Sequence, residues 1–200
     1  MIRAQGFYFC LSWILYNLSN IHVSFFQFLR NCLVKLSFAH VKGSYKFNSL
    51  KCDVLAPEMG YVKQCLIKAI DRKHNMINIE AILNKTITEF EIHFKMVKRE
   101  IGGWHPFLYD MRIDICQFFK NQRKFFIPNF IYSFIKPFTN VNHTCPYLVG
   151  TEMRLWHWSP DEDGVIAKFP VDHGQYGLQT TWYINKVTTL KINGSVLFFK

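Results

Sequence analysis

The sequence lacks the short motifs from which catalysis is usually predicted. It has no Gly-x-Ser-x-Gly nucleophile elbow and no glycine-rich phosphate loop. Its eight histidines are scattered without a His-x-x-x-His pair, and no Cys-x-x-Cys pair suggests zinc or thioredoxin-type chemistry. Asp110 and Asp114 share one polar strand face with Arg112, which is typical of a solvated surface. We read Asp161–Asp163 as an exposed turn. We therefore expect a protein that is not an enzyme and needs no metal or cofactor.

Acidic residues are absent from the first 51 positions, although the chain carries a net charge of +10. The charge is therefore concentrated in an N-terminal segment, and the rest of the chain is only mildly basic. No zinc-finger, basic-zipper or RNA-binding aromatic motif accompanies the basic residues, so a nucleic-acid partner is not expected. This distribution favours a targeting segment followed by a mildly basic domain.

The N-terminal segment resembles a signal peptide. The apolar run Gly6–Leu18 has the length of a signal core and is short for a membrane span. Cleavage after Ser24 is one expectation. Alternatives are a signal core at Cys32–Ala39, an irregular N-terminal helix, or a retained anchor. We therefore divide the chain into a signal peptide or irregular extension at 1–40 and a β-sandwich domain at 44–200.

Cysteines and glycosylation sequons indicate an oxidising compartment. Four of the six cysteines, an even number, fall in the predicted domain, where they allow three disulfide pairings. Asn-x-Ser/Thr sequons occur at Asn17, Asn84, Asn142 and Asn193, of which the last three lie in the domain. We expect a secreted, extracellular glycoprotein stabilised by disulfides.

Alternation of apolar and polar residues predicts an all-β domain. In Thr88–Val97 four apolar side chains alternate with polar ones, and Pro106–Ile115 repeats the pattern after Gly102-Gly103, which suggests a hairpin. After Cys116 the apolar spacing changes to four, which predicts short helices at about 115–121 and 128–136. Further strands are predicted at 45–54, 61–70, 76–83, 151–158, 175–184 and 187–199, with a bulge at Asn193-Gly194. This order favours a two-sheet antiparallel β-sandwich with a helical insertion.

Several motifs resemble a known group. They are the run Trp104–Asp110, the Cys-x-Phe pattern at Cys116–Phe118, the Asn-His-Thr-Cys-Pro-Tyr element at Asn142–Tyr147, and a late element at Phe169-Pro170 and Gly174–Tyr176. Together they resemble an insect family of secreted proteins with a domain of unknown function. That family is related to the CheB chemosensory proteins and is similar to the ML lipid-recognition superfamily, which includes the ganglioside activator.

The resemblance implies an immunoglobulin-like sandwich whose sheets part to hold an apolar ligand. On this reading the protein binds a lipid or other small hydrophobic ligand, with a chemosensory role, and the predicted pocket lining is Phe90, Ile92, Phe94, Met96, Phe107, Tyr109, Met111, Ile113 and Trp182. The same side chains suit a solid core, and the alternative function is therefore an extracellular protein-interaction module without a pocket.

The aromatic insertion between Cys116 and Cys145 is the second predicted functional region. We expect a disulfide between these cysteines to clasp it, and a second disulfide, Cys52–Cys65, to tie the first two strands. Basic residues among the aromatic ones favour either a lid over the pocket or contact with a membrane surface, and the alternative is that the phenylalanines simply pack on the sandwich. The candidate partners of the protein, besides its ligand, are a membrane surface or a receptor. The predicted lid or membrane-contact residues are Phe118, Phe119, Phe125, Phe126, Phe130 and Phe134.

Overall fold

The computed structural model describes residues 44–72, 74–159 and 172–199. The predicted signal segment at 1–40, its cleavage site, the sequon at Asn17, the Phe169-Pro170 element and the acidic run Asp161–Asp163 lie outside the described residues. Among the described residues, no helix has the length and apolar character needed to cross a membrane.

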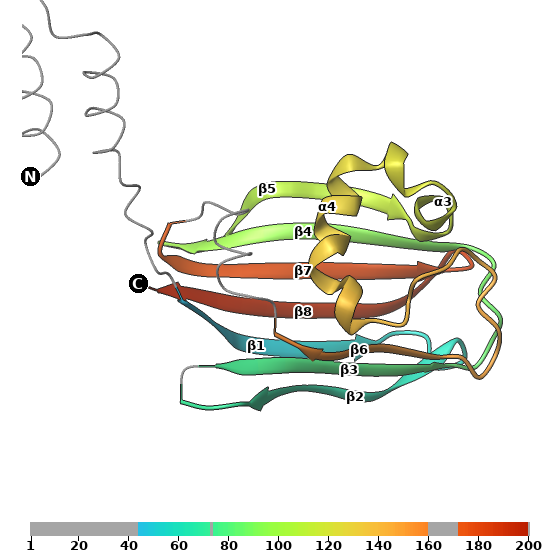
Figure 1. Cartoon of the computed structure of the whole chain (residues 1–200), viewed down its shortest axis with the longest axis horizontal. Helices are drawn as coiled ribbons and strands as arrows, with labels where there is room; N and C mark the ends of the chain where they lie inside the picture. The colour runs from blue at the N-terminus through green and yellow to red at the C-terminus, as the bar shows by residue number, and fades with distance from the viewer. Residues whose placement is uncertain (1–43, 73, 160–171, 200) are drawn as a thin grey trace, which may run out of the picture. The chain divides into compact units, whose positions relative to one another are not determined.

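In the described part of the chain, eight strands form two antiparallel sheets (Figure 1). The larger sheet has the order β1-β8-β7-β4-β5, with bounds β1 Ser44–Val54, β8 Val187–Phe199, β7 Gly174–Ile184, β4 Phe90–Glu100 and β5 Gly103–Asp114. The smaller sheet has the order β2-β3-β6, with bounds β2 Gly60–Ala69, β3 Asn75–Leu83 and β6 Glu152–Trp158. The predicted all-β, two-sheet antiparallel sandwich with a helical insertion is confirmed.

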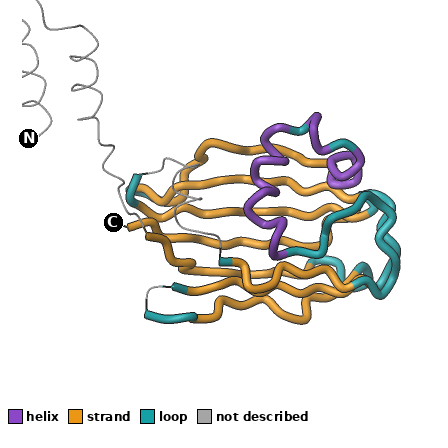
Figure 2. The backbone as a smooth tube through the Cα atoms, in the orientation of Figure 1, coloured by secondary structure: helices purple, strands orange, loops and turns teal. Residues whose placement is uncertain are grey.

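The insertion between β5 and β6 folds into short helices. These are α3 at Ile115–Lys120, the 3-10 turns η1 at Gln122–Lys124 and η2 at Lys136–Phe138, and α4 at Phe126–Ile135. Asp114 begins α3 as its N-cap, since its carboxylate accepts a hydrogen bond from the Gln117 backbone nitrogen at 2.9 Å. Figure 2 shows the helical segment lying across the strands of the larger sheet. The insertion therefore completes the second layer beside β6.

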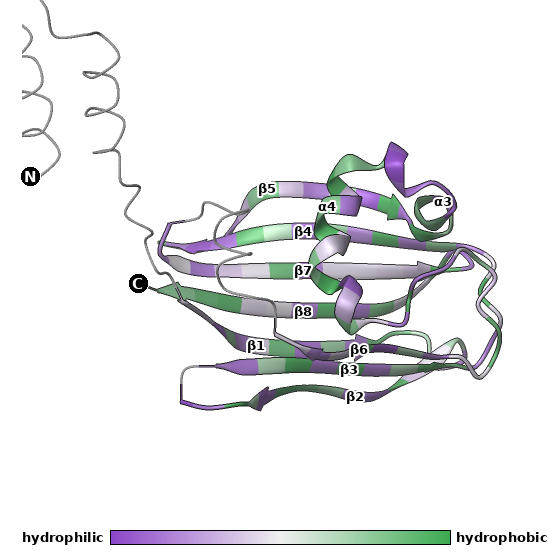
Figure 3. Cartoon of the chain, viewed as in Figure 1, coloured by the Kyte–Doolittle hydropathy of each residue, from purple (hydrophilic) through white to green (hydrophobic). Residues whose placement is uncertain are grey.

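Alternation along the strands decides which side chains face inward. Figure 3 shows hydrophobic and hydrophilic residues alternating along strands such as β4. In the β4–β7 pair, Phe94 lies opposite Thr180 and Met96 opposite Leu178, so these four side chains share the inward face of the sheet. The predicted hairpin at Gly102-Gly103 joins β4 to β5, and both glycines have positive φ angles.

The predicted bulge at Asn193-Gly194 is wrong. These two residues pair without a register shift, with Lys51 and Leu50 of β1 on one side and with β7 on the other. The irregularity lies instead in β1, where the register shifts between Phe47 and Ser49. Because the bulge inserts one extra residue, Phe47 and Leu50 both face inward, which a strict period of two does not allow.

Two ties along β1 connect the sheets. The buried Asn75 of β3 accepts a hydrogen bond from the Phe47 backbone nitrogen at 2.9 Å and donates one to the Phe47 carbonyl at 2.8 Å. Further along β1, a disulfide joins Cys52 to Cys65 of β2. The smaller sheet is therefore fixed to an edge strand of the larger sheet by a side-chain amide and by a covalent bond.

Candidate functional site: an apolar cavity under helix α4

A cavity of about 390 Å³ lies between the inward face of the larger sheet and the layer formed by β3, β6, α3 and α4. Small-molecule sites usually have volumes of roughly 300–1,000 Å³. The lining from the larger sheet includes Ile92, Met96, Leu178, Thr180 and Ile192, all of which are half-buried although they face the other layer. A solid core would bury such central side chains most completely, so the space between the layers is hollow.

Dense packing closes one end of the cavity. The Phe90, Ile115 and Phe118 side chains line the cavity and are 2–8% exposed. They belong to one hydrophobic cluster with the buried Met59, Ile87 and Tyr147 from the adjoining loops. The hollow therefore begins where this cluster ends, among the central residues of the strands.

Helix α4 forms the roof with one apolar stripe. Pro128, Ile131, Tyr132 and Ile135 line the cavity at positions i, i+3, i+4 and i+7, which lie on one face of a helix. The end of the helix is held against β6, because the Trp158 indole donates a hydrogen bond to the Phe134 carbonyl at 3.0 Å. The roof is therefore attached to the smaller sheet at its C-terminal end.

Gly194 keeps the floor of the cavity open. This glycine lies in the middle of β8 and lines the cavity. A Cβ atom there would lie 3.5 Å from the Ser49 carbonyl oxygen and 3.7 Å from a Leu50 methyl, which are ordinary contacts. The backbone thus tolerates a side chain at this position, and any larger side chain would enter the cavity.

The polar groups of the lining have partners within the protein. The Thr180 hydroxyl donates to the Ile192 carbonyl at 3.1 Å and accepts from the Trp182 indole at 3.0 Å. The Tyr132 hydroxyl donates to the Val141 carbonyl at 3.1 Å, and burial raises the pKa of that phenol. Among the described residues, no buried side-chain nitrogen or oxygen lacks a hydrogen-bond partner. The lining therefore offers apolar surface and few free polar groups.

The structure places the predicted pocket residues in two groups. Six of them line the cavity: Phe90, Ile92, Phe94, Met96, Ile113 and Trp182. Tyr109 and Met111 instead pack half-buried against the hydrophobic cluster, and Phe107 packs against Tyr176 with ring centroids 5.0 Å apart. The register between β4 and β5 shifts near Leu108, whose φ is +55°, so the predicted alternation is broken there.

The predicted lid residues also divide. Phe118, Phe119 and Phe134 line the cavity. Phe125 packs edge-to-face on Phe118, and Phe130 packs in the same way on Phe134. Phe126, by contrast, is 84% exposed. The sequence did not lead us to expect side chains of β1, β6 and β8 in the lining. For β8, a signal exists in the apolar residues that recur at every second position near its end.

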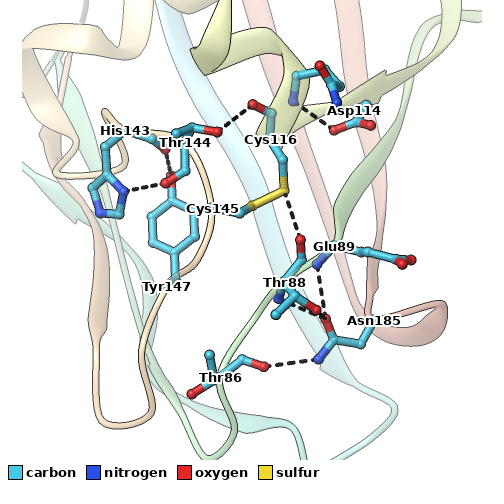
Figure 4. Close-up of a disulfide and its surroundings, with 11 residues drawn as sticks. Thr86, Thr88, Glu89, Asp114, Cys116, His143, Thr144, Cys145, Tyr147 and Asn185 are labelled. Carbon is cyan, nitrogen blue, oxygen red and sulfur yellow. Dashed lines mark hydrogen bonds between the residues drawn. A yellow bond between two sulfur atoms is a disulfide. The ribbon is translucent and has the colours of Figure 1, made fainter.

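A disulfide fixes the insertion at its base. Cys116 in α3 is joined to Cys145, and the Thr144 hydroxyl donates to the Cys116 carbonyl at 2.7 Å (Figure 4). Beside it the Tyr147 hydroxyl donates to the His143 carbonyl, and the His143 ring stacks on Tyr147 with centroids 4.3 Å apart. Both predicted disulfides are therefore present in the structure.

Asn185 connects the β7–β8 turn to the segment that precedes β4. Its side-chain oxygen accepts hydrogen bonds from the backbone nitrogens of Thr88 at 3.0 Å and Glu89 at 3.1 Å (Figure 4). Its amide nitrogen donates to the Thr86 carbonyl at 3.0 Å. Asn185 itself has a φ of +47°, a left-handed conformation that asparagine tolerates better than most residues.

The domain sequons differ in exposure. Asn84 and Asn142 are exposed, whereas Asn193 is half-buried in the middle of β8. Glycosylation at all three remains a prediction, and the strand position makes Asn193 the least accessible to the transferring enzyme.

Burial raises the pKa of Tyr147 to about 12, because the buried phenol loses solvation when it ionises. The unfolded phenol titrates near pH 10, so the folded state holds the proton more tightly. This contribution to stability is complete below about pH 10 and falls as the pH rises toward 12. We expect the urea midpoint to drop more steeply across that range in the parent protein than in Tyr147→Phe. Equal slopes in the two proteins would contradict the assignment.

Ionic groups gather on the outward faces of the sheets. His93 and Asp110 are hydrogen-bonded at 2.6 Å, and this bond, helped by Lys95, lowers the pKa of the Asp110 carboxyl. Glu80 accepts a hydrogen bond from Lys63 at 2.5 Å, and the neighbouring Glu152 and Lys63 side chains lower the pKa of the Glu80 carboxyl. Among the described residues, no group of three or more His, Cys, Asp or Glu side chains could hold a metal ion. These ion pairs lie outside the cavity.

Comparison with known proteins gives one family match. Residues 92–178 match the family model described as "Protein of unknown function (DUF1091)". The matched segment contains the Trp104–Asp110 and Asn142–Tyr147 elements, so the predicted resemblance is confirmed as far as a family of unknown function. Its relation to the CheB proteins and to the ML superfamily remains a prediction. No curated protein sequence matches the chain.

Among solved structures, the chain is similar to a Niemann-Pick type C2 protein from the Japanese carpenter ant. The sequence identity is 9%, the TM-score is 0.30, and the alignment covers 78% of this chain and 93% of that chain. A likeness at this level carries no argument about function, and the functional argument rests on the cavity.

Proposed function

We propose that the protein is a non-enzymatic carrier that holds a small apolar ligand, a lipid or hydrocarbon-like molecule, in the cavity under α4. The observation that supports this most directly is a hollow of about 390 Å³ lined mainly by apolar side chains. Its polar lining groups, such as Thr180 and Tyr132, are already hydrogen-bonded inside the protein. An apolar ligand would enter without breaking these bonds, and the solid core required by the interaction-module alternative does not fit the hollow.

Desolvation would supply the binding energy. Burial of apolar surface contributes about 25 cal/mol per Å², so a ligand that buries about 300 Å² gains about 7.5 kcal/mol. The loss of translational and rotational freedom reduces this gain. With few free polar groups in the lining, selectivity would follow the size and shape of the apolar part. A polar headgroup would remain at the edge of the cavity, in contact with water.

We further propose that the protein acts outside the cell, in keeping with a chemosensory role. Two disulfides support an oxidising compartment, because cytosolic thiols are usually kept reduced. The exposed sequon at Asn142 adjoins one of them. Release into the medium of expressing cells, with a glycan that a peptide N-glycosidase removes, is the expected observation. Retention of all protein in the cytosol would contradict this part of the proposal.

Substitution at the floor of the cavity tests ligand binding. Gly194→Phe places an aromatic ring in the cavity without a backbone clash, so we expect the affinity for a fluorescent fatty acid to fall at least about tenfold. Leu178→Met conserves side-chain volume at a lining position and serves as the matched control, with uptake unchanged within about twofold.

Native mass spectrometry of the same proteins provides an independent readout. We expect co-purified apolar molecules on the parent protein and on Leu178→Met, and their loss from Gly194→Phe. If Gly194→Phe folds normally and takes up the fatty acid as well as the parent protein does, the cavity is not the binding site. If none of the three proteins takes up any apolar probe, the proposed function is wrong.

A further inference from the structure

The segment between β5 and β6 is charged with one sign only. From Ile115 to Thr151 the sequence contains no aspartate or glutamate. Its basic residues Lys120, Arg123, Lys124 and Lys136 are all exposed. Elsewhere in the described structure, cations such as Lys63, Lys95 and Arg112 pair with carboxylates, whereas none of these four has such a pair among the described residues. The segment therefore presents uncompensated positive charge.

An exposed aromatic side chain lies beside this charge. Phe126, the first residue of α4, is 84% exposed and follows Arg123 and Lys124 closely in the chain. Its neighbour Phe125 turns inward and packs on Phe118. A single exposed apolar residue is common on protein surfaces. Phe126 lies beside cations that have no carboxylate partner among the described residues, and this combination is typical of surfaces that bind the headgroup region of a membrane.

The exposed residues stand on a well-packed base. Phe118 is 2% exposed and contacts Phe119, Phe125 and Tyr132 with ring centroids 5.0–6.1 Å apart. The disulfide at Cys116 fixes the same helix at its start. Phe126 and the cations are thus presented on a packed helical layer that is also the roof of the cavity.

We propose that the α3–η1–α4 surface, formed by Lys120, Arg123, Lys124 and Phe126, docks on anionic lipid bilayers. The cations attract the acidic headgroups, and Phe126 inserts among the upper acyl chains. The same layer then contacts the bilayer with its outer face and the cavity with its inner face. This docking does not depend on the proposed ligand binding, because none of the four residues lines the cavity.

Vesicle co-sedimentation tests the docking. We expect the parent protein to bind vesicles of phosphatidylcholine with phosphatidylserine far more strongly than phosphatidylcholine alone, and added salt to weaken that binding. One cation near an anionic surface changes the binding about fivefold, so the charge reversal Arg123→Glu with Lys124→Glu should lower it at least about 25-fold. Phe126→Ser should lower it about tenfold.

Matched variants at other places control for charge and for exposed apolar area. Lys51→Glu with Lys186→Glu reverses the same number of exposed cations on β1 and at the β7–β8 turn. Ile101→Ser removes a fully exposed apolar side chain from the β4–β5 hairpin. Both should bind the anionic vesicles within about threefold of the parent protein, and all variants should keep their uptake of the fluorescent fatty acid.

Two kinds of result would overturn the proposal. One is equal binding to both vesicle types, or equal losses for the control and test variants. The other is binding of a single-stranded oligonucleotide that depends on Arg123 and Lys124 while no vesicle binds, which would assign the surface to nucleic acid. Since fatty-acid uptake is measured on the same samples, failure of docking is distinguished from failure of the proposed function.

Discussion

Replacement of both Cys116 and Cys145 by serine is expected to lower the free energy of unfolding by about 3–4 kcal/mol. The disulfide closes a loop with a sequence separation of 29, and removing it restores conformational entropy to the unfolded chain. The native state also loses the covalent anchor of α3, although the Thr144 hydroxyl can still donate to the backbone carbonyl at position 116. Urea unfolding under non-reducing conditions measures the change.

The second disulfide is the control for this prediction. Cys52–Cys65 closes a shorter loop, with a separation of 13, and its removal should cost about 3 kcal/mol. The two double replacements should also destabilise different parts of the molecule. Hydrogen exchange should rise in α3 and α4 when Cys116 and Cys145 are replaced. It should rise in β1 and β2 when Cys52 and Cys65 are replaced. Unchanged exchange in the helices, with unchanged urea midpoints, would contradict the anchoring role of Cys116.

Asn185→Ala is expected to lower the free energy of unfolding by about 3 kcal/mol. The substitution removes the acceptor of the Thr88 and Glu89 backbone nitrogens and the donor to the Thr86 carbonyl. It also places alanine at a φ of +47°, a left-handed conformation that alanine tolerates less well than asparagine. Thermal and urea unfolding give the magnitude.

Two further substitutions separate these causes. Asn185→Gly removes the hydrogen bonds and relieves the left-handed strain, so its loss should be about 1 kcal/mol smaller than that of alanine. Asn185→Asp keeps the acceptor for Thr88 and Glu89 and loses only the donor to Thr86, so it should be the mildest of the three. If Asn185→Asp is the most destabilising of the three variants, the hydrogen bonds accepted from the Thr88 and Glu89 backbone nitrogens do not account for the contribution of Asn185 to the free energy of unfolding.

The strands could be predicted from the sequence because they follow a period of two. Phe90, Ile92, Phe94 and Met96 alternate with charged residues and do face inward. The hollow could not be predicted, since aromatic and aliphatic residues fill a space or line it equally well. Its volume depends on how far α4 stands from the sheet, which is a tertiary property. Gly194 gave a local signal, but we interpreted it as a bulge.

Within the insertion, composition alone could not assign roles. Phe118 and Phe126 are the same residue type in one aromatic segment, yet they are 2% and 84% exposed. The difference arises from the bend between α3 and α4, which turns Phe118 toward Tyr132 and leaves Phe126 outside. The positions of Phe107 and Tyr109 were missed for a similar reason, because the irregularity at Leu108 breaks the alternation of β5.

The ties along β1 also determine how the cavity can widen. The Asn75 amide and the Cys52–Cys65 bond hold the layers together at the β1 edge of the larger sheet. At the opposite edge, β5 is faced by the helical insertion, which is attached through one disulfide and through hydrogen bonds at its ends. The molecule therefore has a fixed side and a movable side. We therefore expect a ligand larger than this cavity to displace α4 before it separates the layers at the β1 edge.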